Sequence, residues 1–283
     1  SGDLGNSPAP LIKNREPITQ PVDYAVMEST YGARVHEDTL KRKLILEDGI
    51  EETVKRGGVL MIPAFAMERT QELLFELNEL VENGRIPQVP IFLDSPLAIK
   101  LTDVYKRYST NPEFFDKESL DLVKAGDAIF DFPGLKRTLK TEESKRIKDV
   151  DAPKIVIAGS GMSNGGRIIH HETAYLPDPK STLLIIGYQA KGSLGRRLFD
   201  KAKRVKIMGK QVDVRAKIKA IGGYSAHADQ LALINWLKPM RDSIKKTFLV
   251  HGEEEQAIPL ESIIKDQLAI NTHVPDIGET VEL

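Results

Sequence analysis

The sequence predicts an α/β fold in which a parallel sheet is flanked by helices. Two compact apolar runs, at residues 154–158 and 183–186, are typical of strands that are buried on both faces, and residues 59–62 form a further predicted strand. The segments between such runs show helical spacing of apolar residues, as at residues 69–81. Because strands that alternate with helices form parallel sheets, the pattern predicts such a sheet from about residue 35 to residue 222.

The first elements are expected to alternate between strand and helix. Strands are predicted at residues 22–27, 59–62 and 91–93, and helices at residues 38–56 and 69–81. In the first helix the apolar residues recur at roughly helical spacing: Leu40, Leu44, Ile45 and Ile50. Gly57 and Gly58 then end this helix. The second helix is strongly amphipathic, with one apolar face formed by Leu73, Leu74, Leu77, Leu80 and Val81.

The pattern changes towards the end of the chain. Alternate residues from Val212 to Ala220 are apolar, which predicts one half-exposed antiparallel strand. Residues 205–208 and the turn at Gly209 and Lys210 are expected to complete a hairpin with it. The last predicted elements are a helix at residues 228–237, a strand at residues 247–250 and a helix at residues 259–268.

Four short motifs carry acidic residues and histidines that suit a metal site. They contain Asp3, Glu28, His227 and His251. Each motif follows or opens an apolar run, which places it at a strand tip or in a loop where catalytic groups can converge. A carboxylate and two imidazoles form a common ligand set for zinc, but a hydrolytic site with two zinc ions needs more ligands than these.

Each of these residues also has a plain structural interpretation. Asp3 lies in a glycine-containing segment and suits a turn or a helix cap, and Glu28 suits an exposed strand end. A lone histidine at the end of a strand, such as His251, is commonly a hydrogen-bonded structural residue. Ser225 allows a helix to begin there, with His227 in its first turn.

A glycine-rich run at residues 159–167 follows a predicted strand and opens a predicted helix. Free backbone N–H groups at such a junction can bind an anion, and a tight turn without a ligand is the alternative. The run lacks the Gly-Lys-Ser/Thr sequence of a nucleotide-binding P-loop. The neighbouring His170 and His171 are expected to be structural or exposed, because adjacent side chains on a helix diverge.

The composition excludes several classes of site. The chain has no cysteine, which excludes disulfides, thiolate zinc sites and a cysteine nucleophile. Its net charge of −1 is not that of a globally basic nucleic-acid-binding protein, so a polyanion would need a local patch or a metal. One basic segment suits a solvated helix face and phosphate contact equally well. Its residues are Lys191, Arg196, Arg197, Lys201, Lys203, Arg204 and Lys206.

The sequence contains no signal for a membrane or for export. No apolar run approaches the roughly 18 to 20 residues of a membrane span. The amino terminus lacks the charged and then apolar pattern of a signal peptide. A cytoplasmic protein without a membrane partner is therefore expected.

Taken in order, the four motifs resemble those of metallo-β-lactamase-fold nucleases that carry an inserted β-CASP domain. This family includes the mRNA 3′-end cleavage factor and ribonuclease J. The resemblance extends from Asp3 to about residue 255 and also includes four intervening segments. These are Pro63-Ala64-Phe65-Ala66, Leu93-Asp94-Ser95-Pro96, Gly159-Ser160-Gly161-Met162 and Gly187-Tyr188.

The resemblance implies a domain organisation. Residues 1–34 and 223–283 would belong to a metallo-β-lactamase αββα sandwich, and residues 35–222 would form the β-CASP domain. The main metal motif of the family, His-x-His-x-Asp-His, is absent from this sequence. The chain therefore resembles the C-terminal portion of such an enzyme, and this portion alone is expected to be inactive.

The resemblance also implies roles for individual residues. Asp3 would bridge two zinc ions, His251 would bind the second zinc, and His227 would act as a general acid that Glu28 orients. The DNA-processing members tend to carry an apolar residue at the position of His251, so this histidine favours RNA. Phosphate groups of the RNA would be bound by Ser160, Ser163, Arg167, Ser95 and Lys191.

The expected function is that of a zinc-dependent ribonuclease that hydrolyses phosphodiester bonds in RNA processing or decay. The expected cofactor is a pair of zinc ions. The expected partners are single-stranded RNA and either a missing N-terminal segment or a second copy of the chain. Two alternatives remain open, namely a non-catalytic nucleic-acid-binding scaffold and a DNA-processing nuclease of the same superfamily.

Overall fold

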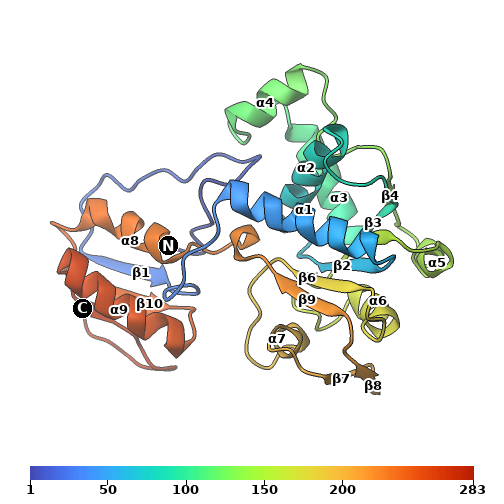
Figure 1. The fold of residues 1–283 in the computed structure, drawn as a ribbon. Coiled ribbons are helices and arrows are strands. Elements are labelled where there is room, and N and C mark those ends of the chain that lie inside the picture. Colours follow the sequence, from blue (N-terminus) through green and yellow to red (C-terminus); the bar gives the residue numbers. More distant parts are fainter. The chain divides into compact units, whose positions relative to one another are not determined.

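The computed structural model describes residues 1–283, which form two compact units (Figure 1). The terminal unit consists of residues Ser1–Pro8, Asn14–His36 and Ser225–Leu283. The central unit consists of residues Ala9–Lys13 and Glu37–Tyr224. Assigning a metallo-β-lactamase sandwich to residues 1–34 and 223–283, and a β-CASP domain to residues 35–222, stays a prediction.

The central unit is built on a six-stranded sheet in which every pairing is parallel. Its strands, in spatial order, are β4 (Leu135–Arg137), β3 (Ile91–Asp94), β5 (Lys154–Ala158), β2 (Val59–Pro63), β6 (Thr182–Ile185) and β9 (Lys217–Ala220). Its α-helices are α1 (Thr39–Lys55), α2 (Arg69–Glu82), α3 (Pro96–Tyr108), α4 (Lys117–Lys124), α5 (Thr141–Arg146), α6 (Ile168–Tyr175) and α7 (Leu194–Phe199). Two 3₁₀-helices are η1 (Ile147–Asp149) and η2 (Gly222–Tyr224). The predicted α/β fold with a parallel sheet is therefore confirmed.

Both faces of this sheet are buried, as the continuous apolar runs predict. Successive residues of a strand point to opposite faces. Leu60 and Ile62 of β2 accordingly join a core cluster that contains residues of α1, α2 and α3. Val59 and Met61 join a second cluster, which contains residues of α6 and α7. Helices therefore cover the sheet on both sides.

Helix α1 occurs where the sequence predicts it, but its buried face differs from the expected one. The Asp38 side chain caps its amino terminus by accepting a hydrogen bond from the Lys41 amide. Leu40 and Leu44, which were expected on the apolar face, are 68% and 44% exposed. The buried positions instead include Arg42, whose guanidinium donates to Glu76 on α2. A buried ion pair with a distant carboxylate cannot be read from apolar spacing.

The single antiparallel strand predicted from Val212 to Ala220 is wrong. β7 (Arg204–Ile207) and β8 (Lys210–Asp213) form the predicted antiparallel hairpin. The chain then leaves the hairpin, because the amides of Arg215 and Ala216 donate to the carbonyl of Leu176. β9 follows and pairs in parallel with β6, at one edge of the central sheet.

The terminal unit is built on three parallel strands, in the order β1 (Tyr24–Glu28), β10 (Lys246–Val250) and β11 (Thr272–His273). Its helices are α8 (Gln230–Leu237), η3 (Lys238–Met240) and α9 (Glu254–Leu268). A single cluster joins Met27 and Leu249 of the strands to Leu233 of α8 and Leu260 of α9. Val26, on the other face of β1, is 54% exposed. No helix in either unit is both long enough and apolar enough to span a bilayer.

Candidate metal and general-acid site

The candidate site lies at the carboxyl ends of two neighbouring parallel strands of the terminal unit. Strand β1 ends at Glu28, which is in register with Val250 at the end of β10. His251 is the next residue after Val250. Because the carboxyl ends of parallel strands meet at one edge of a sheet, Glu28 and His251 are placed on the same side of the unit.

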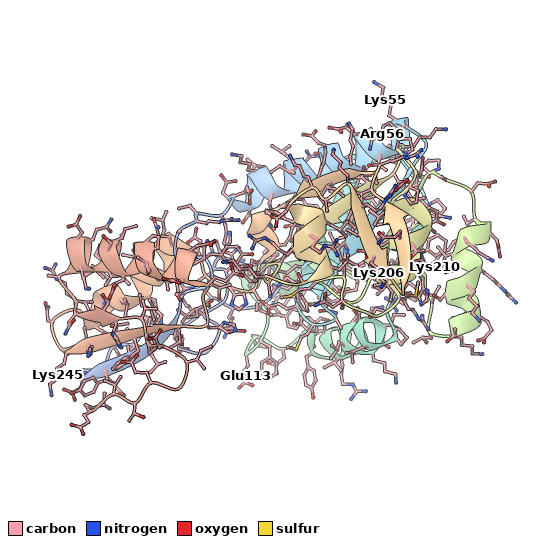
Figure 2. The ribbon with its side chains drawn as sticks, turned by 90° about the horizontal axis from the view of Figure 1, so that it is seen from below. Lys55, Arg56, Glu113, Lys206, Lys210 and Lys245 are labelled. Carbon is pink, nitrogen blue, oxygen red and sulfur yellow. The ribbon has the colours of Figure 1, made fainter.

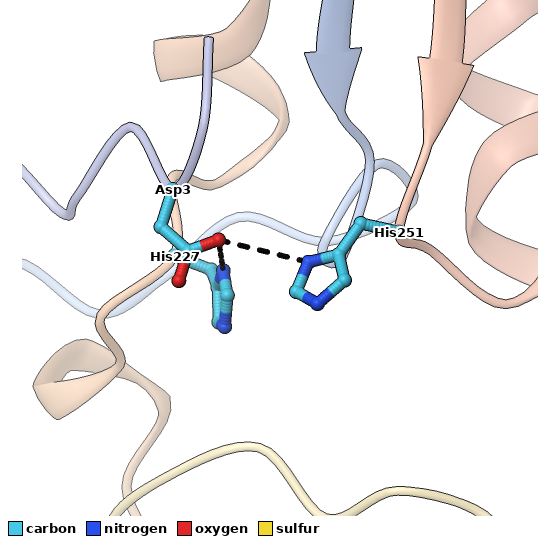
Figure 3. Close-up of side chains that lie close together, drawn as sticks. All are labelled: Asp3, His227 and His251. Carbon is cyan, nitrogen blue, oxygen red and sulfur yellow. Dashed lines mark ion pairs between the residues drawn. The ribbon is translucent and has the colours of Figure 1, made fainter.

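Three side chains with metal-binding atoms converge at this edge (Figure 3). Each of Asp3, His227 and His251 offers one ligand atom, and these atoms all lie within 4.8 Å of one another. The Asp3 Oδ1 atom is 3.8 Å from His227 Nδ1 and 3.7 Å from His251 Nδ1. A carboxylate and imidazole nitrogens at this separation suit a divalent metal such as zinc.

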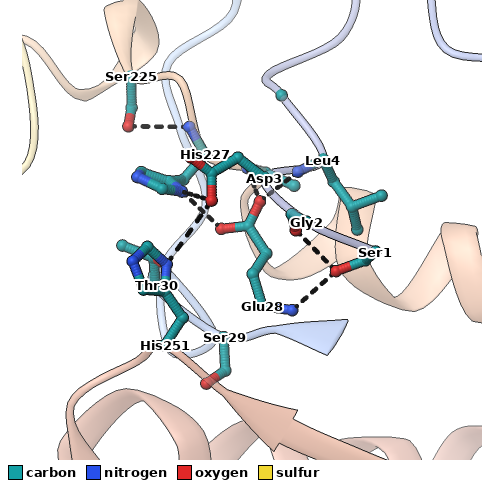
Figure 4. Close-up of polar contacts among 12 residues, drawn as sticks. Ser1, Gly2, Asp3, Leu4, Glu28, Ser29, Thr30, Ser225, His227 and His251 are labelled. Carbon is teal, nitrogen blue, oxygen red and sulfur yellow. Dashed lines mark hydrogen bonds and ion pairs between the residues drawn. The ribbon is translucent and has the colours of Figure 1, made fainter. Parts of the chain in front are cut away.

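His227 is bound more closely by Glu28 than by Asp3 (Figure 4). Its Nδ1 atom is 2.8 Å from Glu28 Oε2. Although burial raises the pKa of Glu28, the hydrogen bond and charge of His227 and the Leu4 amide lower this pKa below its ordinary value overall. Glu28 is therefore ionised and accepts a hydrogen bond from the Nδ1–H group of His227, which leaves Nε2 of His227 free of this contact.

Glu28 is buried and is held by the backbone on two further sides. Its Oε1 atom accepts hydrogen bonds from the amides of Leu4, at 2.7 Å, and Ala228, at 3.4 Å. Its own amide donates to Ser1 Oγ at 3.0 Å. The carboxylate thus links the segment that carries Asp3 to the segment that carries His227. The interpretation of Glu28 as an exposed strand end is wrong, because its exposed fraction is only 2%.

The segment around His227 is a loop and not a helix. The Asp229 side chain accepts a hydrogen bond from the Ala232 amide and caps α8, which begins at Gln230. The alternative that places His227 in the first turn of a helix is therefore wrong. The His227 amide donates to Ser225 Oγ at 3.2 Å, and its carbonyl lies 3.2 Å from Nε2 of His36.

His251 has a backbone conformation that L-residues rarely adopt, with φ of 65°. Its Nδ1 atom is 3.4 Å from Thr30 Oγ1. Gly252 follows in close contact with Ser29, the residue after β1, because a Cβ atom there would lie 2.4 Å from the Ser29 carbonyl oxygen. Non-glycine residues in this region of backbone conformation are concentrated at functional sites.

The Asp3 segment is fixed by the rest of the terminal unit. The Arg15 guanidinium donates to the Gly5 carbonyl at 3.1 Å and to the Ala232 carbonyl at 3.3 Å. The Asp3 side chain itself is 60% exposed, and the His251 side chain is 57% exposed. The site therefore combines a buried carboxylate, Glu28, with an open face that bears the other groups.

The five residues expected to bind phosphate lie in the central unit. Ser95 caps α3 by accepting from the Ala98 amide, and Ser160 Oγ is 3.4 Å from the Gly165 carbonyl. Ser163 is buried and donates to Glu172, and Arg167 donates to Asp94 and to the carbonyls of Thr138 and Leu139. Lys191 is exposed. Their binding of phosphate stays a prediction.

Asp94, at the end of β3, is a buried carboxylate that binds side chains from several neighbouring segments. It accepts hydrogen bonds from Arg167 at 2.8 Å, Ser144 at 2.8 Å and His171 at 2.7 Å. Burial raises its pKa, but the bonds from His171, Thr138 and Ser144 outweigh burial and hold the pKa at about 2. His171 is therefore structural, as expected, and His170 is exposed.

Three residues that contribute to the site were given no role in it from the sequence. They are Thr30, Ser225 and His36, which contact His251 or His227. Thr30 and Ser225 each lie two residues from a motif residue, which is the only signal that the sequence offers. The contact of His36 with His227 joins segments that are far apart in the chain and has no local signature.

Comparison with known proteins gives two family matches and a set of relatives. Residues 70–198 match the Beta-Casp domain, and residues 211–275 match the Zn-dependent metallo-hydrolase RNA specificity domain. The chain is 36% identical over 265 residues to Ribonuclease TTHA0252 of Thermus thermophilus, covering 93% of the chain and 59% of that protein.

Two archaeal proteins are similar over comparable lengths. Transcription termination factor FttA of Methanosarcina mazei is 31% identical over 270 residues, which cover 93% of the chain and 42% of the factor. The RNase J-like protein of Methanocaldococcus jannaschii is 32% identical over 282 residues, which cover 98% of the chain and 63% of that protein. The chain thus spans about half the length of the relatives that it matches.

Proposed function

The chain belongs to the β-CASP family of metallo-β-lactamase-fold nucleases, and from this premise we propose that the protein is a zinc-dependent ribonuclease. The relatives are named as a ribonuclease, a transcription termination factor and an RNase J-like protein. The RNA specificity domain, matched at residues 211–275, supports RNA over DNA as the substrate.

The observation that carries the proposal is the pairing of Glu28 with His227 beside Asp3 and His251. A non-catalytic scaffold has no need for a buried carboxylate that is hydrogen-bonded to a histidine at 2.8 Å. Nor does it need a second histidine and an aspartate that bring metal-binding atoms within 4.8 Å of this histidine. This arrangement favours hydrolysis over binding alone.

We assign the metal to Asp3 and His251. Both side chains are exposed, and the Asp3 Oδ1 atom is 3.7 Å from His251 Nδ1, so the two residues would hold a metal ion together. Two zinc ions are proposed for the complete site, with further ligands beyond those of this chain. Bound zinc supplies Lewis-acid chemistry, which activates water as a nucleophile and neutralises charge on a phosphodiester.

The remaining chemistry is assigned to His227. With Nδ1–H donated to the Glu28 carboxylate, Nε2 carries the proton in the imidazolium form and can donate it to the leaving oxygen of the phosphodiester. Glu28 fixes the orientation of the ring and stabilises its positive charge. Hydrolysis then leaves neutral His227, a phosphate monoester on one RNA product and a hydroxyl on the other.

The experiment that tests this function is RNA cleavage by His227→Ala in the protein at its full natural length. A general acid contributes a factor of about 10²–10⁴ to the rate, so the variant should cleave a labelled single-stranded RNA more slowly by that factor. His170→Ala, at an exposed histidine of the central unit, is the matched control and should cleave at the wild-type rate. Equal rates for both variants would exclude His227 as the acid.

A further inference from the structure

A basic surface on the central unit takes no part in the proposed mechanism. Residues 201–219 contain eight Lys or Arg residues and one acidic residue, Asp213, in a chain whose net charge is −1. They belong to the turn after α7, the β7–β8 hairpin and the edge strand β9. We call this the β9-edge surface and define it by Lys201, Lys203, Lys206, Lys210, Lys217 and Lys219.

The fold brings together lysines from two separate segments. Lys201 and Lys203 precede β7, whereas Lys217 and Lys219 lie on β9. All four line one cavity of about 310 Å³, together with the apolar side chains of Val214 and Ile218. This volume is at the lower end of the ~300–1,000 Å³ range of ligand pockets. Cationic groups from two segments in one cavity suit a phosphate group.

Part of the positive charge on this surface is neutralised within the protein. Glu52 binds Lys219 at 2.8 Å and Lys217 at 3.3 Å. Asp213 binds Arg204 at 2.7 Å and Arg215 at 3.7 Å. These two carboxylates compensate the charges of Lys217, Lys219, Arg204 and Arg215.

Four lysines remain without a carboxylate at ion-pair distance, namely Lys201, Lys203, Lys206 and Lys210. All four are exposed. Lys206 and Lys210, labelled in Figure 2, belong to the two strands of the hairpin, where Lys206 is opposite Gln211 and Lys210 is opposite Ile207. The surface therefore presents uncompensated positive charge to solvent.

Protection of the sheet edge is the simpler explanation for lysines on an edge strand, because charged side chains there prevent pairing with other chains. It accounts for Lys217 and Lys219, which lie on β9. It does not account for Lys201 and Lys203, which lie in the turn between α7 and β7 and pair with no strand. The surface thus carries more charge than edge protection requires.

We propose that the β9-edge surface binds the phosphate backbone of single-stranded RNA. The proposal rests on the proposed ribonuclease function and adds a second contact with the substrate, formed by residues of the central unit alone. Lys217 and Lys219 lie within the segment that matches the RNA specificity domain, which supports RNA as the polyanion. The surface acts through charge, so it binds RNA without reading its sequence.

The test measures binding without cleavage. A fluorescein-labelled single-stranded RNA of about 20 nucleotides is titrated with protein in EDTA, and the dissociation constant is recorded by anisotropy at several salt concentrations. The variant carries Gln at positions 201, 203, 206 and 210. The matched control carries Gln in place of two other exposed lysines of the central unit, Lys100 and Lys124.

For single strands, the slope of the logarithm of the binding constant against the logarithm of the salt concentration falls in magnitude by about 0.7 for each phosphate contact that is lost. The fourfold variant should therefore lower the magnitude of this slope by roughly 3. Its affinity near 0.1 M salt should fall at least tenfold, and the control should match the wild type. An unchanged slope would overturn the proposal. Tighter binding of polyglutamate than of RNA of equal charge, lost in the same variant, would instead assign the surface to an acidic protein.

Cleavage assays separate this proposal from the proposed function. With metal present, the fourfold variant should cleave an RNA of about six nucleotides at the wild-type rate, and a long RNA with a raised KM. If the wild type cleaves no RNA, the ribonuclease function fails, whereas the binding result stands on its own.

Discussion

Replacing Glu172 by Gln tests whether a buried carboxyl group beside the glycine-rich run is protonated. Glu172, on α6, is fully buried. Its Oε1 atom accepts a hydrogen bond from Ser163, and its Oε2 atom has no hydrogen-bond partner. Burial raises its pKa from 4.5 to about 8, against the lowering effect of the Ser163 bond. At neutral pH the group is therefore mostly an uncharged acid.

The sign of the pH dependence follows from the raised pKa. The folded protein binds the proton more tightly than the unfolded chain does. The contribution to stability is therefore complete below the unfolded pKa of 4.5 and is lost as the pH rises through about 8. Each pH unit within this window costs about 1.4 kcal/mol. Between pH 5.5 and 7.5, the wild type should lose about 2.5 kcal/mol through this group.

Urea unfolding at pH 5.5 and 7.5 measures the effect. Gln has nearly the same shape and does not titrate, so the stability of E172Q relative to wild type should rise by about 2.5 kcal/mol between these pH values. Glu142→Gln, at an exposed glutamate on α5, is the control and should show no such change. A difference between E172Q and wild type that stays constant with pH would refute the account of Glu172.

Two further substitutions test the scaffold and the site. Asp94→Asn removes the charge that binds His171 and Arg167, and should lower the free energy of unfolding by ~3–5 kcal/mol at pH 7, measured in urea. Because the pKa of Asp94 is about 2, this deficit should shrink as the pH falls towards that value, and a loss below about 1 kcal/mol would contradict the network. Gly252→Ala places a Cβ atom 2.4 Å from the Ser29 carbonyl oxygen and should cost ~1–3 kcal/mol. An unchanged Tm in calorimetry would show that this contact relaxes freely.

The fold of the central unit was predictable from the sequence because its strands are buried on both faces. Continuous apolar runs predicted β2, β5 and β6, and the helical spacing of apolar residues predicted α2. The errors lie where distant contacts override local pattern. β9 joins the parallel sheet through β6, and Arg42 replaces Leu40 and Leu44 on the buried face of α1.

The candidate site was predictable only in part. Its motif residues were recognised through family resemblance, since no local rule brings Glu28 and His227 together. The contacts that complete the site come from Thr30, Ser225 and His36, and two of the three join distant segments. The basic segment recognised in the sequence ended at Lys206 and did not include the lysines of β9. Only the fold places these lysines beside Lys201.

The most direct test of the central claim is the zinc content of two variants, measured by elemental mass spectrometry on the purified full-length protein. The account assigns Asp3 to the metal and His227 to proton transfer. It therefore predicts that Asp3→Ala loses zinc, whereas His227→Ala retains the zinc of the wild type and loses cleavage. Loss of zinc from His227→Ala to the same extent as from Asp3→Ala would make His227 a metal ligand and contradict its assignment as the general acid.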